Sequence, residues 1–210
     1  MEVKFVDKMG SDLSVVNAAR VSFAKENKEF QVVDDSRLIR YLAKHNHWSP
    51  FGHASLQFHV TAPVFVARQL VKHQVGLVWN EVSRRYVDSE PEFHFVEEWR
   101  GSPDNKKQGS SDDIIPIAPH IQDDYIDMCK FTYKYLLEAG VAPEQARMVL
   151  PQSMMTEWYW SGTLMAFARV CNLRCKEDAQ KETQDIAHSI DSLCRAQFPV
   201  SWNALRNMPT

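Results

Sequence analysis

The sequence predicts an α+β fold, with a mixed sheet and long helices, in a single catalytic domain spanning residues 1–210. Apolar residues recur at helical spacing over long segments, whereas other segments alternate polar and apolar residues as strands do. Strands and helices mix without regular alternation, which disfavours a doubly wound parallel sheet. The chain is 44% apolar and 24% charged, as is ordinary for a soluble globular domain.

The N-terminal half is expected to contain strands and helices in nearly equal number. The strands are expected over residues 2–7 and 54–60, and the helices over residues 13–22, 37–45 and 64–73. Ser11 or Asp12 can cap the first helix, and Ser36 can cap the second, because short polar side chains accept hydrogen bonds from free backbone amides. Pro63 stands where the third helix should begin.

The C-terminal half is expected to be mostly helical. The helices are expected over residues 119–140, 144–150, 163–173 and 176–198, with one strand over residues 154–162. Pro119 opens the first of these helices, and Gly140 suits its end because glycine readily adopts the left-handed conformation found there. Pro151 stops the short second helix. Residues 101–116 are rich in Gly, Ser, Asp and Pro, which predicts a polar loop.

The bulk composition argues against several classes of protein. The formal net charge of -3 does not favour general affinity for nucleic acids or membranes. No apolar run approaches the roughly 20 residues that cross a bilayer, and no signal-peptide pattern is present. The four cysteines are not expected to form a disulfide framework without a secretory context. A cytoplasmic location is therefore expected.

No metal site is expected. Four histidines lie close in the sequence, at His45, His47, His53 and His59, but no nearby carboxylate or thiol pattern completes a tetrahedral zinc set. A turn whose histidines form hydrogen bonds near the core or a flat cofactor is the more ordinary interpretation. The seven glycines form no dinucleotide fingerprint, P-loop or nucleophile elbow. A bound phosphate would therefore be held by side chains and helix ends.

The most unusual segment is KHQVGLVWNEVSRRY, residues 72–86, which begins at the C-terminal end of a predicted helix. Together with that helix it offers four cations, Arg68, Lys72, Arg84 and Arg85, and further hydrogen-bonding side chains, Gln69, His73, Gln74, Asn80 and Ser83. The only acid among them is Glu81. Arginine forks match phosphate oxygens in pairs, which favours a pocket for a phosphorylated small molecule. The alternative is a solvated basic helix end with salt bridges.

Two further arginines, Arg147 and Arg174, lie next to apolar segments. An arginine in such a place either needs a buried or interfacial anionic partner or extends its charged end to a surface carboxylate. Both interpretations stay open for each residue.

The segment RQLVKHQVGLVWNEVSRRY resembles the signature of the flavin-dependent thymidylate synthases, in which a helix ending R-H-R precedes a serine, usually inside N-E-x-S-x-R-Y. DLSVVNAARVSF, HWSPFGHASLQFHVTAPVFVARQ, ARMVLP and NLRCKEDAQ are similar to that family in order and spacing. The resemblance covers most of the chain, apart from residues 101–116 and the last dozen residues. R-H-R is replaced by Lys72-His73-Gln74, and one more residue than usual separates Gln74 from Ser83.

The resemblance implies the fold and activity of that family. The reaction would convert dUMP to dTMP, with methylenetetrahydrofolate as carbon donor, FAD as cofactor and NADPH as the reductant of the flavin. The protein would be a homotetramer with active sites at subunit interfaces. Its partners would be small molecules, with no nucleic acid and no membrane.

The resemblance also implies roles for individual residues. Arg174 would be catalytic, because its guanidinium would stabilise negative charge developing on the pyrimidine ring. The dUMP site would comprise Arg68, Gln69, Lys72, Glu81, Ser83, Arg84, Arg85 and Arg147. The FAD site would comprise His47, Ser49, Lys72, His73, Gln74, Glu81, Thr163, Met165 and Arg169. No cysteine lies in the basic segment, which disfavours the alternative of a cysteine that attacks C6 of uracil.

Two other functions stay open. A flavin-dependent relative could hydroxymethylate dUMP or methylate another pyrimidine nucleotide, and the altered signature is compatible with that change. A non-catalytic nucleotide- or RNA-binding module would use the basic segment without a redox partner. The acidic net charge and the lack of further basic stripes count against this module.

Overall fold

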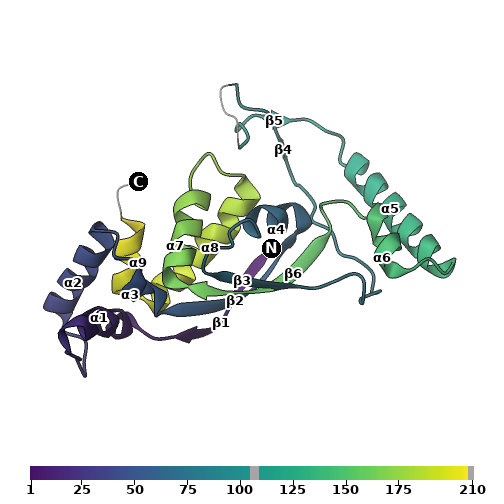
Figure 1. Cartoon of the computed structure of the whole chain (residues 1–210). Coiled ribbons are helices and arrows are strands. Elements are labelled where there is room, and N and C mark those ends of the chain that lie inside the picture. The colour runs from purple at the N-terminus through teal and green to yellow at the C-terminus, as the bar shows by residue number, and fades with distance from the viewer. Residues whose placement is uncertain (105–108, 208–210) are drawn as a thin grey trace.

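A computed structural model describes residues 1–104 and 109–207 of the chain (Figure 1). Its centre is a four-stranded sheet with the order β1-β2-β6-β3. The strands are β1 (Glu2–Met9), β2 (Ser55–Pro63), β6 (Met155–Thr163) and β3 (Leu77–Glu81). The predicted α+β class is confirmed. Among the described residues, no helix is both long enough and apolar enough to span a bilayer.

The helices form three groups, one over the sheet and one at each end of the molecule (Figure 1). They are α1 (Asp12–Arg20), α2 (Val32–Lys44), α3 (Ser49–Gly52), α4 (Val64–Leu70), α5 (His120–Glu138), α6 (Pro143–Ala146), α7 (Leu164–Arg174), α8 (Lys181–Gln197) and α9 (Pro199–Arg206), with short 3₁₀ turns at Val21–Phe23 and Arg147–Val149. In Figure 1, α4, α7 and α8 lie above the sheet, α1, α2, α3 and α9 gather at one end, and α5 and α6 lie at the other.

The sheet is antiparallel at every strand pair among the described residues, so the expectation of a mixed sheet is wrong. The helix α4 connects β2 to β3, and these two strands run in the same direction. They do not pair, because β6 lies between them and pairs antiparallel with both. The parallel pair that a strand–helix–strand crossover usually forms is therefore absent here.

The hydrophobic core lies between the sheet and α7. Residues of β2 alternate between half-buried and buried, and this alternation turns Phe58 and its buried neighbours toward the helix. Phe167 of α7 packs edge-on against Phe58 and Trp160, with ring centroids 5.0 and 5.3 Å apart. All three rings are fully buried, so this contact fixes α7 on the sheet.

Several element boundaries differ from the sequence expectation. Helix α2 begins at Val32 rather than after Ser36, because the carboxylate of Asp35 accepts a hydrogen bond from the Gln31 amide and stabilises an earlier first turn. Helix α4 ends at Leu70, short of residue 73. Short elements that were not predicted are α3, β3 and α9.

The predicted polar loop over residues 101–116 is partly structured. Strands β4 (Trp99–Arg100) and β5 (Ile114–Ile115) pair at its two ends. The Gly101 amide donates to the Asp113 carbonyl over 2.8 Å, which continues this ribbon into the loop. Residues 105–108 of the predicted loop lie outside the described residues.

Gly162 is required where β3 joins the sheet. A Cβ at this position would lie 2.4 Å from Cδ2 of Leu77 and 2.5 Å from the carbonyl oxygen of Gly76. We expect Gly162→Ala to lower the free energy of unfolding by about 1–3 kcal/mol, because the backbone of the neighbouring strand has to move. Urea denaturation measures this loss.

Gly52→Ala is the matched control, because a Cβ there meets only the Trp48 ring, at 3.4 Å. Equal stability of the two variants would contradict the proposed clash.

Candidate active site

Two cavities meet at Arg68, an exposed residue of α4. One has a volume of about 570 Å³ and is defined by Arg68, Glu81, Arg84 and Arg147; we call it the arginine cavity. The other has a volume of about 870 Å³ and is defined by Phe65, Gln69, Lys72, Trp99, Tyr125 and Glu182; we call it the aromatic cavity. Residues from distant parts of the chain therefore form adjoining hollows around one helix.

The arginine cavity brings together three guanidinium groups that the sequence separates. Arg68 comes from α4, Arg84 from the segment after β3, and Arg147 from the turn before β6. Arg84 donates to the Ser89 carbonyl, and Arg147 donates to the Glu144 carbonyl over 3.3 Å. Within residues 1–104 and 109–207, none of the three forms an ion pair with a carboxylate, so their charge is available to an anion.

Acidic residues also line the arginine cavity. Glu81 accepts hydrogen bonds from the Thr156 hydroxyl at 2.8 Å and from the Trp79 indole at 3.2 Å. Glu157 lies 3.5 Å from His59, and Glu90 lies 3.2 Å from Lys130. Glu81 is thus oriented by its neighbours toward a cavity that can receive both an anion and a hydroxyl donor.

Ser83 and Arg85 lie on the exposed segment after β3, outside the described lining of either cavity. The Ser83 hydroxyl accepts from Nε of Arg85 at 3.1 Å, and the Arg85 guanidinium lies 4.9 Å from the centre of the Tyr86 ring. In this conformation these two residues bond to each other and are not part of the described lining of either cavity.

Arg174 lies at the last turn of α7, where it contacts the turn that follows α4. Its Nε donates to Nε2 of His73 over 3.0 Å. Burial and the neighbouring charge of Arg174 lower the pKa of His73, so this imidazole is neutral near pH 7 and carries its proton on Nδ1. Burial also lowers the pKa of Arg174, although a guanidinium keeps its proton in proteins. Arg174 is thus a fixed, half-buried cation.

The residues assigned to FAD fall into two places. Thr163 and the turn after Gln74 are joined by a 3.0 Å hydrogen bond from the Thr163 amide to the Gly76 carbonyl. Glu81 lies at the opposite end of β3 from Leu77, roughly 13 Å away at strand spacing. Only an extended ligand can reach both ends of this strand.

Other members of the FAD set differ in accessibility. His47, Ser49 and Arg169 are exposed, at the start of α3 and on α7. Met165 is only 5% exposed and packs in the hydrophobic core, where its side chain cannot meet a ligand at the surface. Thr163 uses its hydroxyl to cap α7, where it accepts from the Ala166 amide at 3.2 Å.

Sequence analysis missed several residues of the aromatic cavity. Glu182 and Arg100 form an ion pair at its wall, and Gln180 lies beside them. The segment NLRCKEDAQ was recognised only as far as Gln180, and an acid in the first turn of an amphipathic helix reads as an ordinary surface residue. Tyr125 of α5 is 57% exposed and also lines this cavity.

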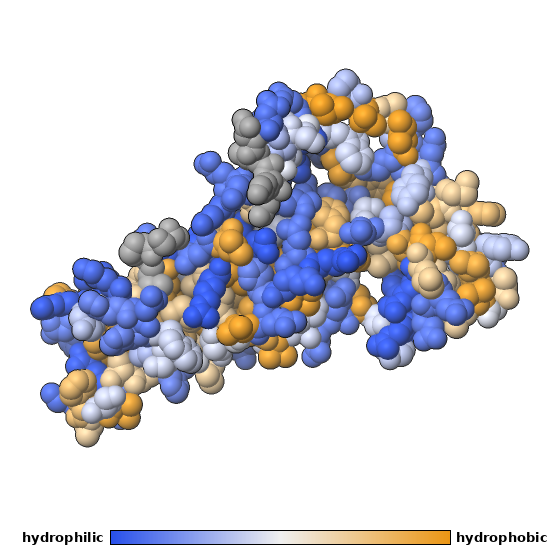
Figure 2. Space-filling model, turned by 45° about the horizontal axis from the view of Figure 1, so that its top comes forward, coloured by the Kyte–Doolittle hydropathy of each residue, from blue (hydrophilic) through white to orange (hydrophobic). Residues whose placement is uncertain are grey.

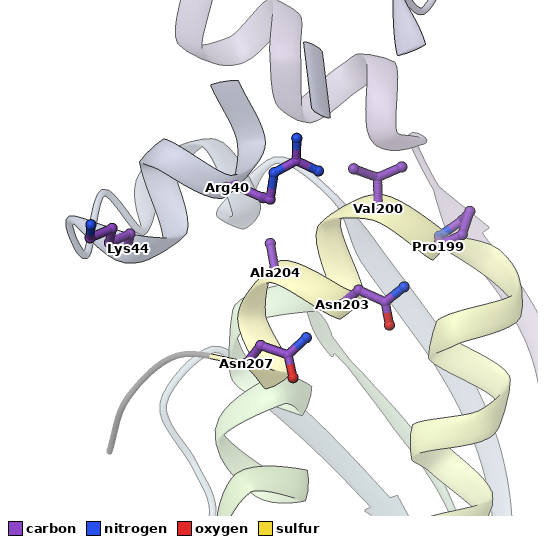
Figure 3. A pocket seen from close by; sticks show the side chains of 7 residues that line it. All are labelled: Arg40, Lys44, Pro199, Val200, Asn203, Ala204 and Asn207. Carbon is purple, nitrogen blue, oxygen red and sulfur yellow. The ribbon is translucent and has the colours of Figure 1, made fainter. Parts of the chain in front are cut away.

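A third cavity, of about 850 Å³, lies between α2 and α9 (Figure 3). Its lining contains none of the residues that sequence analysis assigned to a site. Arg40 reaches into the gap between the two helices, whereas Lys44 points away from it (Figure 3). Asn203 accepts a hydrogen bond from Arg195. This cavity is separate in its residues from the other two.

Known proteins were compared with the chain. The family model described as thymidylate synthase complementing protein matches residues 4–200. The flavin-dependent thymidylate synthase of Kosmotoga olearia is 38% identical over 209 residues, covering 98% of this chain and 90% of that protein. The flavin-dependent thymidylate synthase of Thermus thermophilus is 38% identical over 207 residues, covering 96% and 74%.

Solved structures show the same relationship. A UMP/dUMP methylase from Streptomyces cacaoi bound with 5-Br dUMP has a TM-score of 0.85 and 30% identity, covering 99% of this chain and 95% of that chain. The same methylase bound with 5-Br UMP has a TM-score of 0.82 and 29% identity. The match to the family model extends over almost the whole chain. This protein therefore belongs to the thymidylate synthase complementing protein family.

Proposed function

We propose that this protein is a flavin-dependent thymidylate synthase that converts dUMP to dTMP, with residues 1–210 as one catalytic domain. The observation that carries the proposal is the arginine cavity, where Arg68, Arg84 and Arg147 converge without carboxylate partners among the described residues. Such a group suits the phosphate of a nucleotide, because guanidinium forks bind phosphate oxygens in pairs. Glu81 is placed to accept from a sugar hydroxyl.

The pyrimidine would lie toward the aromatic cavity, which adjoins the arginine cavity at Arg68. Transfer of a carbon to C5 requires electron density there, so the ring must be stabilised as it gains negative charge. Arg174, which lies outside the described lining of both cavities and is held in place by His73, would provide this stabilisation from beside them. Ser83 and Arg85 would turn from each other to the phosphate when the nucleotide binds.

The cofactor would be FAD, reduced by NADPH, and methylenetetrahydrofolate would donate the carbon. When bound and reduced, FAD would supply the hydride for this chemistry. The exposed side chains of His47, Ser49 and Arg169 fit an extended dinucleotide, and Lys72, His73 and Gln74 would bound the same site. The buried Met165 does not fit a direct contact.

The assembly would be a homotetramer with active sites at subunit interfaces. One end of the molecule, which carries α5, shows apolar side chains at the surface (Figure 2). Met128, Phe131 and Met148 are 63%, 68% and 79% exposed there. Surfaces of this kind are commonly covered by another chain. Light scattering is expected to give four times the 24.3 kDa chain mass.

We expect the purified protein to be yellow and to form dTMP from dUMP, methylenetetrahydrofolate and NADPH. Mass spectrometry of the product distinguishes the possibilities, because a methyl and a hydroxymethyl product differ by one oxygen. Anaerobic bleaching of the flavin by NADPH checks the reductant. Colourless protein that takes up no added FAD, or a product other than dTMP, would contradict the proposal.

A second candidate substrate is UMP, because the similar solved structures are of a UMP/dUMP methylase. The same assay with UMP in place of dUMP tests this candidate. We expect the larger kcat/KM with dUMP. A larger kcat/KM with UMP would assign the protein to ribonucleotide methylation instead.

A further inference from the structure

Glu182 is a buried carboxylate at the wall of the aromatic cavity. It is 7% exposed and lies in the first turn of α8, where the helix dipole favours negative charge. Arg100 donates to one of its oxygens over 2.5 Å, and Nε2 of Gln180 donates to the other over 2.9 Å. Burial alone would raise the pKa of Glu182, but hydrogen bonds from Arg100, its own backbone amide and Gln180 hold this pKa below its ordinary value. Glu182 is therefore ionised at neutral pH and can only accept hydrogen bonds.

The ionised carboxylate of Glu182 fixes which way the side-chain amides of Gln180 and Gln69 are turned. Gln180 must turn its NH₂ group to Glu182, so its carbonyl oxygen faces Gln69. Gln69 must then turn its own NH₂ group to Gln180. The carbonyl oxygen of Gln69 is left facing the Thr183 hydroxyl, which lies at 3.2 Å and donates to it. Thr183 is fully buried, so water does not compete at this end.

Gln69 has further hydrogen-bonding capacity on the side that lines the aromatic cavity. Its NH₂ group keeps a second donor, and its carbonyl oxygen keeps a second lone pair. In a free glutamine side chain these two ends exchange by a flip of the amide, and either order can be presented to a ligand. Here the order is set by Glu182 through Gln180, and the Thr183 hydroxyl, which can donate or accept, donates to the oxygen that this order leaves.

Uracil and cytosine present opposite orders along the edge from N3 to C4. Uracil has an N–H donor followed by a carbonyl acceptor, whereas cytosine has an acceptor followed by an amino donor. An amide of fixed direction can match only one of them, and the mismatched base leaves buried polar groups without partners. We propose that Glu182 is a positioning residue that fixes the amide of Gln69 and thereby makes this site select uracil over cytosine. The inference rests on the proposed function, because it requires a pyrimidine nucleotide beside Gln69.

Glu182→Gln tests the proposal with little change in size, because a neutral amide can either donate or accept at the same position. The dissociation constants of dUMP and dCMP are measured by calorimetry on the FAD-loaded full chain. We expect the wild type to bind dUMP far more tightly than dCMP, and Glu182→Gln to reduce this ratio by about tenfold or more. Glu177→Gln is the matched control on an exposed residue of the segment before α8, and the ratio should not change.

Gln180→Met is the second variant, because it removes the amide that passes the direction from Glu182 to Gln69, with little change in size. It is expected to reduce the preference for dUMP over dCMP in the same way. It tests the inference by itself if Glu182→Gln does not fold. An equal loss of affinity for both nucleotides in the folded variants would show a merely structural role and overturn the inference. Wild-type protein that binds neither nucleotide would overturn the proposed function and the inference with it, whereas wild type selective for dUMP with unchanged ratios in both variants would overturn the inference alone.

Discussion

Replacing Arg174 with alanine is expected to lower dTMP formation by about 10²–10³-fold, a loss typical when one preorganised donor to a developing charge is removed. The guanidinium is half-buried and held by its 3.0 Å hydrogen bond to His73, so it needs little reorganisation in the transition state. Binding of FAD should persist, because the exposed residues of the FAD set remain. Steady-state kinetics and the flavin absorbance of the variant measure the two effects separately.

Two companion variants sharpen this test. Arg174→Lys keeps the positive charge but loses the planar fork, and it should recover only part of the activity. Lys176→Ala removes an exposed cation two residues away and should behave as the wild type. A rate near that of the wild type in Arg174→Ala would show that the pyrimidine ring is not polarised by this residue.

Replacing Asp35 with alanine is expected to lower the free energy of unfolding by about 3–5 kcal/mol, because it leaves a buried charge network without its acceptor. The Asp35 side chain is fully buried and accepts from Arg20 at 2.8 Å, from Asn27 at 3.0 Å and from the Gln31 amide at 2.8 Å. These bonds tie the segment before α2 to the end of α1. Urea denaturation at pH 7 measures the loss, with the exposed Asp34→Ala as control.

The same residue makes stability depend on pH in a defined direction. Burial opposes ionisation of Asp35, but hydrogen bonds from the Gln31 backbone, Arg20 and Asn27 lower its pKa below the ordinary value of 3.8. Because the pKa of Asp35 is lower in the folded state than in the unfolded state, its ionised carboxylate stabilises the fold. This stabilisation is complete at a pH above the unfolded pKa and is lost as the pH falls through the folded pKa. The stability difference between wild type and Asp35→Ala should therefore be constant near neutral pH and shrink below about pH 4. A difference that does not vary with pH would contradict the assignment.

The periodicity of apolar residues along the sequence was sufficient to predict the longer helices and strands of this fold. Alternating and helical periodicities predicted β1, β2 and β6 and the helices α5, α7 and α8, because the spacing of apolar residues follows the period of each element. On α5 this spacing marked the element but not the buried face, since Met128 and Tyr135 are 63% and 62% exposed. The short strand β3 has no such pattern. It exists because its backbone pairs with β6 and because Trp79 stacks on Trp158 with ring centroids 4.2 Å apart.

The topology of the sheet could not be predicted in the same way. Whether β2 and β3 pair with each other or with β6 depends on contacts between residues far apart in the sequence, such as Leu77 with Gly162, which are 85 positions apart. The secondary-structure preferences of nearby residues do not show which distant strands pair. A mixed sheet was therefore expected, whereas an antiparallel sheet is found.

The sequence by itself determined the family, which the comparison confirmed, and the chemical types available to the site: arginines, amides and one acid in the segment around residues 68–86. Only the tertiary structure decided how these groups are shared between two cavities and that Arg174 contacts His73. It also decided that Met165 is buried and that Glu182 is linked to Gln69 through Gln180. The roles assigned to the individual residues stay predictions. The division has a physical reason. Residue type and periodicity are local properties, whereas the meeting of α4 with α8 and of β3 with β6 depends on packing across the whole chain.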